Sequence, residues 1–220
     1  MITLNQLKSN PYLSEFIKRT ETRMHNLKYT NHGFDHASLV SDRARTIAME
    51  IGLAEKEQEL SAIAGFAHDF ANFLSRGYHN YFGALIFYQT FAKDFSPAEM
   101  ALLMQAIANH DKFDMEFSDP ISAVVVLADK SDVRRSRVTI KDMKIIKEDI
   151  HNRVNFAVKS TKLGFNKQKK IITLNLKIDT NFVPVMEYFE IFTERMVYCR
   201  KAAEYLGYKF GLVINNFKLL

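Results

Sequence analysis

One histidine–aspartate doublet, His68-Asp69, stands among side chains that belong in a protein core. The five residues before it, 63–67, are Ile-Ala-Gly-Phe-Ala. An imidazole or a carboxylate that is buried without a partner costs roughly 2–7 kcal/mol. A metal ion is a partner that both side chains can share, because histidine nitrogens and carboxylate oxygens are ordinary ligands of transition metals. The doublet therefore predicts a metal site whose remaining ligands come from other elements.

Two further residues stand in suitable places for such a site. His36 lies at the start of an expected helix, and Asp129 ends the apolar run 123–128. Each is an ionisable group beside a helix that should be buried, where only a satisfied polar side chain is tolerated. A His-Asp dipeptide alone is ordinarily a surface pair or a capped core histidine. The order His36, His68-Asp69, Asp129 is much more specific.

Apolar periodicity predicts the helices that must position these residues. Apolar side chains recur every three or four positions over 39–51, and Gly52 is a natural stop for that helix. They recur again over 62–74, with the doublet inside the helix. A further helix is expected over 97–109. Its start is typical, because Ser96 is a good N-cap, proline fits the first helical position and Glu99 completes a capping box.

The apolar period changes after Asp149. Apolar residues alternate over 154–158 and again over 172–178, which predicts two strands. The segment 163–168 between them predicts the hairpin connection. The second strand has one apolar face, formed by Ile172, Leu174, Leu176 and Ile178.

A long helical pattern opens at Pro184, and residues 208–214 follow it as a third expected strand. The chain is therefore expected to be mainly α. We predict a helical bundle over residues 1–150 and a small α+β appendage over residues 151–220, made of an antiparallel hairpin and a helix.

Composition limits the classes of protein that fit. Hydrophobic residues make up 47% of the 220, including 18 Phe and 9 Tyr, so a sizeable core is available. The sequence contains 8 Gly and 4 Pro, which argues against collagen-like or low-complexity chains. Cys199 is the single cysteine, which excludes an internal disulfide and a multi-cysteine zinc site. With neither a secretion signal nor a membrane span in the pattern, we expect a cytoplasmic protein with no membrane partner.

Charge is distributed unevenly along the chain. The net charge is +5, yet residues 134–177 alone contain 13 Lys and Arg against 3 Asp and Glu. A basic segment attracts phosphate-rich partners through its long-range potential. A solvated basic surface is the simpler explanation, so a nucleic acid partner is disfavoured. The sequence does not predict an oligomeric state.

The segments around His36, His68-Asp69 and Asp129 resemble those of the HD superfamily of metal-dependent phosphohydrolases. That superfamily has the order His, then His-Asp, then Asp on a bundle of helices. Residues 32–40 are similar to its first-histidine segment, 65–71 to its doublet and 128–132 to its closing aspartate. The resemblance covers about residues 30–135 and implies a helical HD-type bundle. It implies metal ligation by His36, His68, Asp69 and Asp129, with Asp69 also the expected catalytic residue.

A subset of the superfamily adds two histidines and holds two metal ions. One segment begins at His79 and another ends at His110-Asp111. Each is similar to one of the two family segments that carry the additional histidines. The resemblance therefore implies His79 and His110 as further ligands, with Asp69 bridging the ions. The alternative is that His79 is an exposed loop residue and that His110 caps its helix. Four imidazoles and two carboxylates suit one or two divalent transition-metal ions, with iron favoured and manganese, nickel or zinc as alternatives.

The sequence departs from the family at Asn72. Many members have a lysine three residues after the aspartate of the doublet, whereas asparagine offers a phosphate no positive charge. Arg76 lies four residues further along and is a replacement on the same face. The departure disfavours the cyclic-dinucleotide phosphodiesterase branch. Arg76, Lys112 and Lys130 are the candidates for contact with substrate phosphate.

Two weaker candidates flank the ligand segments. His32 precedes His36 by four residues and could share its site, although a place in the preceding turn is the simpler explanation. Asp132 follows Asp129 by three residues and is a candidate for orienting a ligand.

These features together predict a metal-dependent phosphohydrolase that acts on a small phosphorylated molecule such as a nucleotide or dinucleotide. Metal-activated water would be its nucleophile. One alternative is a metal-containing protein that binds or senses nucleotides with little turnover, which Asn72 favours. Another is a di-iron oxygenase, because di-iron centres on related helical bundles perform that chemistry.

Overall fold

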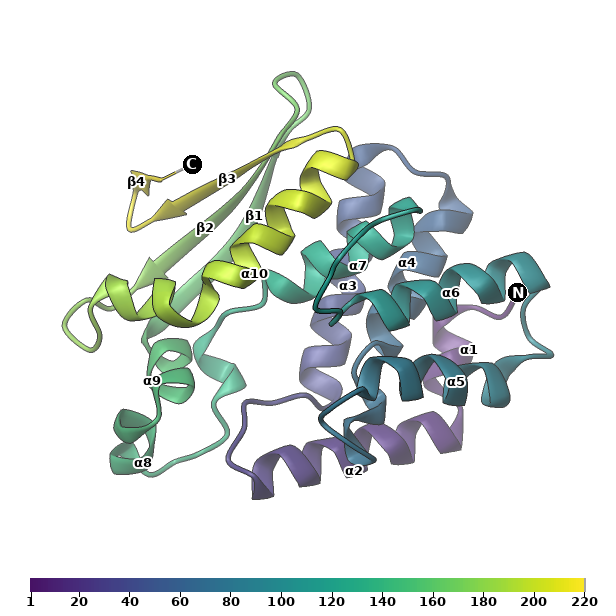
Figure 1. Cartoon of the computed structure of the whole chain (residues 1–220), viewed down its shortest axis with the longest axis horizontal. Helices are drawn as coiled ribbons and strands as arrows, with labels where there is room; N and C mark the ends of the chain where they lie inside the picture. Colours follow the sequence, from purple (N-terminus) through teal and green to yellow (C-terminus); the bar gives the residue numbers. More distant parts are fainter. Residues whose placement is uncertain (220) are drawn as a thin grey trace. The chain divides into compact units, whose positions relative to one another are not determined.

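The computed structural model describes residues 1–219, which form a mainly α fold with a small sheet near the C-terminus (Figure 1). This confirms the predicted fold class. The chain divides into two compact units, one of residues 1–24 and 32–129, the other of residues 25–31 and the chain from 130 onward. Our division at residue 150 stays a prediction about folding domains. Among residues 1–219, no helix combines the length and apolar character that a membrane crossing requires.

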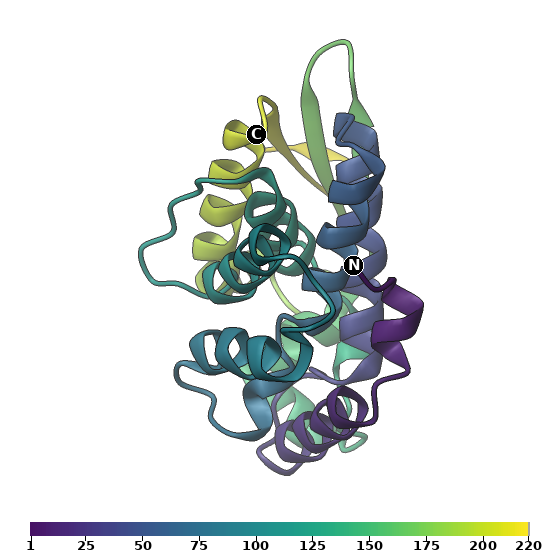
Figure 2. The ribbon, with the colours of Figure 1, turned by 90° about the vertical axis from the view of Figure 1, so that its right-hand side faces the viewer.

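The helical part of the chain surrounds one apolar core. Its elements are α1 (Leu4–Lys8), α2 (Pro11–Asn26), α3 (Phe34–Ile51), α4 (Glu55–Ala67), the 3-10 helix η1 (Phe70–Phe73), α5 (His79–Phe91), α6 (Pro97–Asn109) and α7 (Pro120–Lys130). Helix α4 packs on both α3 and α6, and α5 lies beside α6 (Figure 2). The core includes Ile63 and Phe66 of α4, Phe87 of α5, and Leu103 and Ile107 of α6.

Two helix boundaries agree with the sequence pattern. Helix α3 ends at Ile51 because Gly52 takes φ 86°, a left-handed conformation that glycine adopts without steric cost. At the start of α6, the Ser96 hydroxyl accepts a hydrogen bond from the Glu99 amide. The Glu99 carboxylate in turn accepts one from the Ser96 amide at 2.8 Å, so the predicted capping box is present.

The expectation of one continuous helix over 62–74 is wrong. Helix α4 ends at Ala67, and η1 begins only at Phe70, so the His68-Asp69 doublet lies at the break between them. The Asp69 carbonyl accepts hydrogen bonds from the backbone amide of Asn72 at 3.1 Å and from its side chain at 2.9 Å, which tightens the chain into a 3-10 turn. Adjacent residues of an α-helix point about 100° apart. The break frees the doublet from that restriction.

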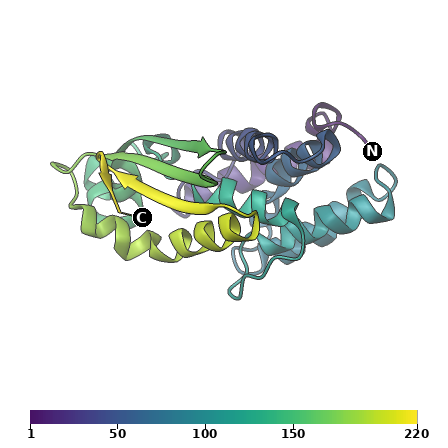
Figure 3. The same cartoon turned by 90° about the horizontal axis from the view of Figure 1, so that it is seen from above.

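The C-terminal part of the chain is an α+β unit. Its elements are the 3-10 helix η2 (Arg135–Arg137), α8 (Met143–Glu148), α9 (Ile150–Ala157), β1 (Val158–Asn166), β2 (Ile171–Ile178), α10 (Val185–Tyr205), β3 (Lys209–Ile214) and β4 (Phe217–Lys218). The strand order is β1-β2-β3-β4, with β1 antiparallel to β2 and β3 parallel to β2. Helix α10 makes the crossover between these parallel strands and runs along one face of the sheet (Figure 3).

Two local predictions in this unit are wrong. Residues 154–157 are helical, because Asp149 caps α9 by accepting a hydrogen bond from the Asn152 amide at 2.8 Å, and a short alternation of apolar residues does not outweigh that start. The hairpin turn lies at 167–170 instead of 163–168, since β1 stays paired up to Asn166 opposite Ile171. The predicted apolar face of β2 is confirmed, with all four side chains buried.

The capping glutamate of α6 leads to a prediction about acid stability. Glu99 is buried, and its carboxylate lies 2.6 Å from Lys56 Nζ on α4. The hydrogen bond from Lys56, helped by the one from Ser96, lowers the pKa of Glu99 to about 2 from its ordinary 4.5. This stabilisation is therefore complete above about pH 4.5 and is lost as the pH falls towards 2.

Glu99→Gln should keep the cap and lose the ion pair. We expect a loss of about 0.5–1 kcal/mol in the free energy of unfolding at pH 7, shrinking as the pH falls from 5 to 3. Urea denaturation across that range measures it. Glu57→Gln is the matched control, because Glu57 caps α4 through the Ala54 amide at 2.9 Å. A difference between Glu99→Gln and wild type that is constant with pH would contradict the prediction.

Candidate metal centre

The six residues predicted as metal ligands are all buried in the first unit. They come from the ends of five helices: His36 begins α3, His68 and Asp69 follow α4, His79 begins α5, His110 follows α6 and Asp129 lies near the end of α7. None of the six is more than 6% exposed. The structure therefore brings together residues that are up to 93 positions apart in the sequence.

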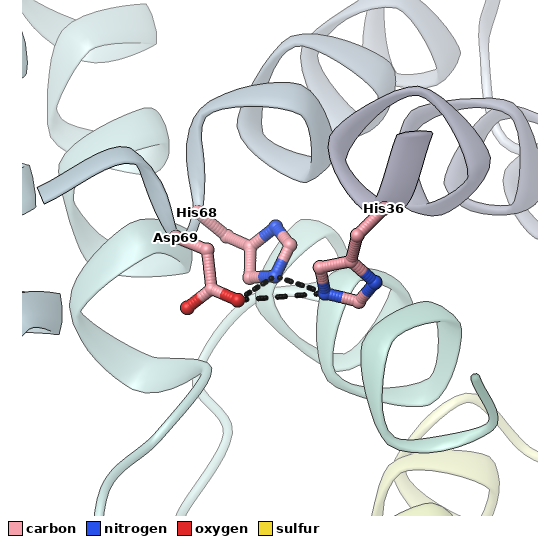
Figure 4. A group of neighbouring side chains, drawn as sticks. All are labelled: His36, His68 and Asp69. Atoms are coloured by element: carbon pink, nitrogen blue, oxygen red, sulfur yellow. Dashed lines mark hydrogen bonds and ion pairs between the residues drawn. The ribbon is translucent and has the colours of Figure 1, made fainter. Parts of the chain in front are cut away.

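Four of these side chains form a first cluster. His36 Nε2 lies 3.2 Å from His68 Nε2, and Asp69 Oδ2 lies 3.4 Å and 3.2 Å from these two nitrogens (Figure 4). Asp129 Oδ1 approaches the same nitrogens, at 3.3 Å from His36 and 3.7 Å from His68. Asp69 and Asp129 thus each place a carboxylate oxygen within 3.7 Å of both imidazole nitrogens.

A second cluster forms on the other oxygen of Asp69. Asp69 Oδ1 lies 3.0 Å from His79 Nε2 and 3.3 Å from His110 Nε2, and the two nitrogens are 3.1 Å apart. The two oxygens of the Asp69 carboxylate therefore face different pairs of imidazoles. This is the arrangement that a carboxylate shared by two cations requires.

Backbone hydrogen bonds set the orientation of three of the imidazoles. The Nδ1 atoms of His68, His79 and His110 lie 2.6–2.8 Å from the carbonyl oxygens of Gly65, Arg76 and Ile107. A carbonyl oxygen only accepts, so each Nδ1 carries a proton, and each ring turns its Nε2 towards the clusters as the atom available to a metal. This is the usual support of a metal-binding histidine.

The second cluster has the donors to hold a cation. Two imidazole nitrogens and a carboxylate oxygen meet there within 3.3 Å of one another. Two ligand atoms that lie about 2.1 Å from one ion and at right angles to each other are about 3 Å apart. The observed separations of 3.0–3.3 Å fit that geometry. The donor set thus fits a divalent transition-metal ion.

The electrostatics of the centre also favour a bound cation. Burial opposes a charge on His68, but the carboxylates of Asp69 and Asp129 outweigh it and raise the pKa of His68 to about 10. Burial likewise opposes a charge on Asp69, but His68 and hydrogen bonds from His110 and His36 hold the pKa of Asp69 well below its usual range. Burial lowers the pKa of His110. The clustered carboxylates therefore attract positive charge, and a metal ion would displace the His68 proton.

Comparison with known families agrees with this centre. The family model of the HD domain matches residues 33–135. This chain carries an HD domain. All six residues of the two clusters fall inside the match, and proteins with HD domains bind divalent metals. HD domains are typical of the superfamily of metal-dependent phosphohydrolases. No curated protein matches the chain.

The three predicted phosphate contacts have different surroundings. Arg76 is exposed and its Nη1 donates a hydrogen bond to Asn72 Oδ1 at 3.1 Å. Lys112 is half-buried, two residues beyond His110 in the HD domain. Lys130 directly follows Asp129 and its side chain is buried. Contact of these residues with substrate stays a prediction.

The alternatives considered for the two extra histidines have separate outcomes. His79 is 1% exposed, so it is not an exposed loop residue. His110 does stand at the end of α6, yet its ring bonds the Ile107 carbonyl through Nδ1 and turns Nε2 towards Asp69. A place at the helix end and a place in the HD centre are thus compatible for His110.

Two more side chains lie near the centre. His32 is buried, with Nε2 4.0 Å from Asp69 Oδ2, so its four-residue spacing from His36 was an informative signal. Asp111 Oδ2 lies 3.8 Å from His79 Nε2, a neighbour that the sequence analysis missed. Its position beside His110 was the available signal. Both residues border the HD centre at distances longer than those within the clusters.

Proposed function

We propose that this chain is a metal-dependent phosphohydrolase that acts on a small phosphorylated molecule such as a nucleotide or dinucleotide. One observation carries the proposal: the two oxygens of Asp69 face two separate pairs of imidazoles, at 3.0–3.4 Å. One ion would be held by His36, His68, Asp69 and Asp129, and the second by Asp69, His79 and His110. Iron is the favoured metal, with manganese, nickel and zinc as alternatives.

The residues of the centre have separate roles in this proposal. When bound, divalent ions lower the pKa of water towards about 7 and polarise a phosphoryl oxygen. Asp69 supplies negative charge to both metal positions because its carboxyl stays ionised despite its burial. The hydrogen bonds at Nδ1 keep the Nε2 atoms of His68, His79 and His110 turned inward. Arg76, Lys112 and Lys130 would hold the substrate phosphate by charge-assisted hydrogen bonds.

A substrate screen tests the proposal. Protein purified without added metal is analysed for its elements, stripped with a chelator and reloaded with iron, manganese, nickel or zinc in turn. Each form is then assayed for phosphate release from a panel of mononucleotides, dinucleotides and simple phosphate esters. We expect release that depends on the metal. Absence of turnover with all four metals across the panel would overturn the proposal.

The environment of Asn72 supports one competing function. The side-chain amide of Asn72 is buried and bonded to Asp69 and Arg76, so a neutral group stands where many relatives have a lysine. A centre that binds a nucleotide with little turnover is consistent with that. Thermal stabilisation by a nucleotide that is not hydrolysed would favour it. Oxygen consumption by the reduced iron form would favour a di-iron oxygenase.

The lysines of the hairpin turn provide a test of substrate steering. Lys167, Lys169 and Lys170 are exposed at the turn between β1 and β2. Their replacement by Glu should leave metal content and folding intact, because none of them belongs to the metal centre. If they attract a phosphorylated substrate, the apparent KM should rise about tenfold at low ionic strength and return towards the wild-type value in 0.5 M salt.

Steady-state kinetics at two salt concentrations measure this effect. Lys18→Glu combined with Lys93→Glu lowers the net charge by four, and both lysines are exposed and lie in the first unit. It is the control for the same charge change made by Lys167→Glu combined with Lys169→Glu. A KM that does not change at low salt would make the three turn lysines a solvated edge without a role in steering.

A further inference from the structure

Asn72 contacts the shared carboxylate of the metal centre directly. Its side chain is fully buried on η1, and its Nδ2 lies 2.9 Å from Asp69 Oδ1. The same nitrogen lies 2.9 Å from the Asp69 carbonyl oxygen. Both amide protons of Asn72 are therefore given to Asp69, one to its backbone and one to its side chain.

Arg76 determines which end of the Asn72 amide faces Asp69. The guanidinium has five donors and no acceptor, and its Nη1 lies 3.1 Å from Asn72 Oδ1. A flipped amide would place the NH2 group against the guanidinium and the carbonyl oxygen against the anionic Asp69. Both contacts would be repulsive. The observed orientation gives each end of the amide a matching partner.

We propose that Asn72 is a positioning residue that holds Asp69 Oδ1 in the second cluster, and that Arg76 keeps the Asn72 amide in its donating orientation. This inference rests on the two-metal centre of the proposed function. A carboxylate rotates easily about its terminal torsion. The hydrogen bond from Asn72 opposes that rotation and keeps Oδ1 on the side of His79 and His110.

The two metal positions should respond differently to the loss of this hydrogen bond. The first cluster has Asp129 in addition to Asp69, and Asp69 reaches it through Oδ2. In the second cluster, Asp69 Oδ1 is the carboxylate oxygen that lies within 3.3 Å of both imidazoles. Asn72 bonds Oδ1 and not Oδ2. Loss of Asn72 should therefore weaken the second ion selectively.

Metal affinity measures the effect independently of activity. Wild type and Asn72→Leu are loaded with two equivalents of zinc and titrated with a chelator, and the zinc retained is counted by element analysis. Removal of an outer partner typically lowers metal affinity by 10–100-fold. We expect that loss for one ion of Asn72→Leu, with the other ion retained as in wild type.

Substitutions of the exposed residue Arg76 give a second pair of variants, which test the orientation of the Asn72 amide. Arg76→Met should weaken the same ion by a smaller factor, because the Asn72 amide is then free to flip. Arg76→Lys should keep the wild-type affinity for the second ion, since an ammonium also donates to Asn72 Oδ1. Thr20→Val is the control for a lost buried hydrogen bond at η1, because Thr20 Oγ1 donates to the Phe70 carbonyl at 2.6 Å. It should leave both ions bound as in wild type.

The outcomes separate this inference from the function on which it rests. Equal affinity for the second ion in wild type and Asn72→Leu would overturn the inference alone. Parallel weakening of both ions in Asn72→Leu would also overturn it, because the role of Asn72 would then be structural. A wild-type protein that never holds a second zinc ion would overturn the two-metal proposal, and the inference with it.

Discussion

Asp69→Ala should remove bound metal and phosphohydrolase activity together while the protein stays helical. The Asp69 carboxylate lies within 3.4 Å of Nε2 of all four imidazoles, so its loss removes a carboxylate oxygen from both clusters. Because Asp69 contacts the proposed ions directly, we expect more than the 10–100-fold loss of metal affinity typical of an outer partner. Element analysis and phosphate release measure the two effects, and circular dichroism checks the helices.

Asp119→Ala is the matched control for Asp69→Ala. Asp119 is also a buried aspartate of the first unit, and it caps α7 by accepting hydrogen bonds from the Ser122 amide at 2.8 Å and the Ser122 hydroxyl at 2.7 Å. Its loss should cost about 1 kcal/mol of stability and leave metal bound. Stoichiometric metal and full activity in Asp69→Ala would refute the assignment of the centre.

Replacement of either His79 or His110 by alanine should remove about one equivalent of metal. Both imidazoles belong to the second cluster, where each supplies one of three close donors. The first cluster keeps His36, His68, Asp129 and the Oδ2 atom of Asp69, so one ion should stay bound. Activity should fall by at least about a hundredfold if two ions are required. The residue lost would contact the ion directly, whereas the 10–100-fold effect is typical of a residue that only supports a ligand.

The reciprocal variant and a distant histidine complete this experiment. His36→Ala should disturb the first cluster and leave the close contacts among Asp69 Oδ1, His79 and His110 in place. His151→Ala is the control, because His151 is exposed on α9 and lies outside both clusters. Unchanged metal content in both His79→Ala and His110→Ala would restrict the protein to one metal ion.

Part of this protein can be read from local sequence. The α3 end at Gly52 and the α6 start at Ser96 were predicted because each depends on residues within one helical turn. The buried face of β2 was predicted because alternation is set by the strand period alone. Four ligand candidates, His36, His68, Asp69 and Asp129, were found because a buried histidine or carboxylate is costly without a partner, wherever the chain folds. The resemblance to the HD superfamily added His79 and His110.

Local competition explains the predictions that were wrong. The segment 154–157 has alternating apolar residues, but the Asp149 cap decides for a helix. The doublet was expected inside a helix because Ala, Phe and Leu continue the apolar pattern beyond it. The hydrogen bonds from Asn72 to the Asp69 carbonyl end the regular helix instead. Each outcome is decided by local polar contacts that periodicity does not record.

The geometry of the centre was decided by tertiary structure alone. The order of His36, His68-Asp69, His79, His110 and Asp129 in the sequence gives their types but not the torsion of the Asp69 carboxylate. That torsion sends Oδ2 to one pair of imidazoles and Oδ1 to another, and it depends on where five helix ends meet. Likewise, Asn72 is a mere departure from a pattern in the sequence. It becomes a partner of Asp69 only when Arg76 orients its amide, because hydrogen bonds are directional and need both atoms in place.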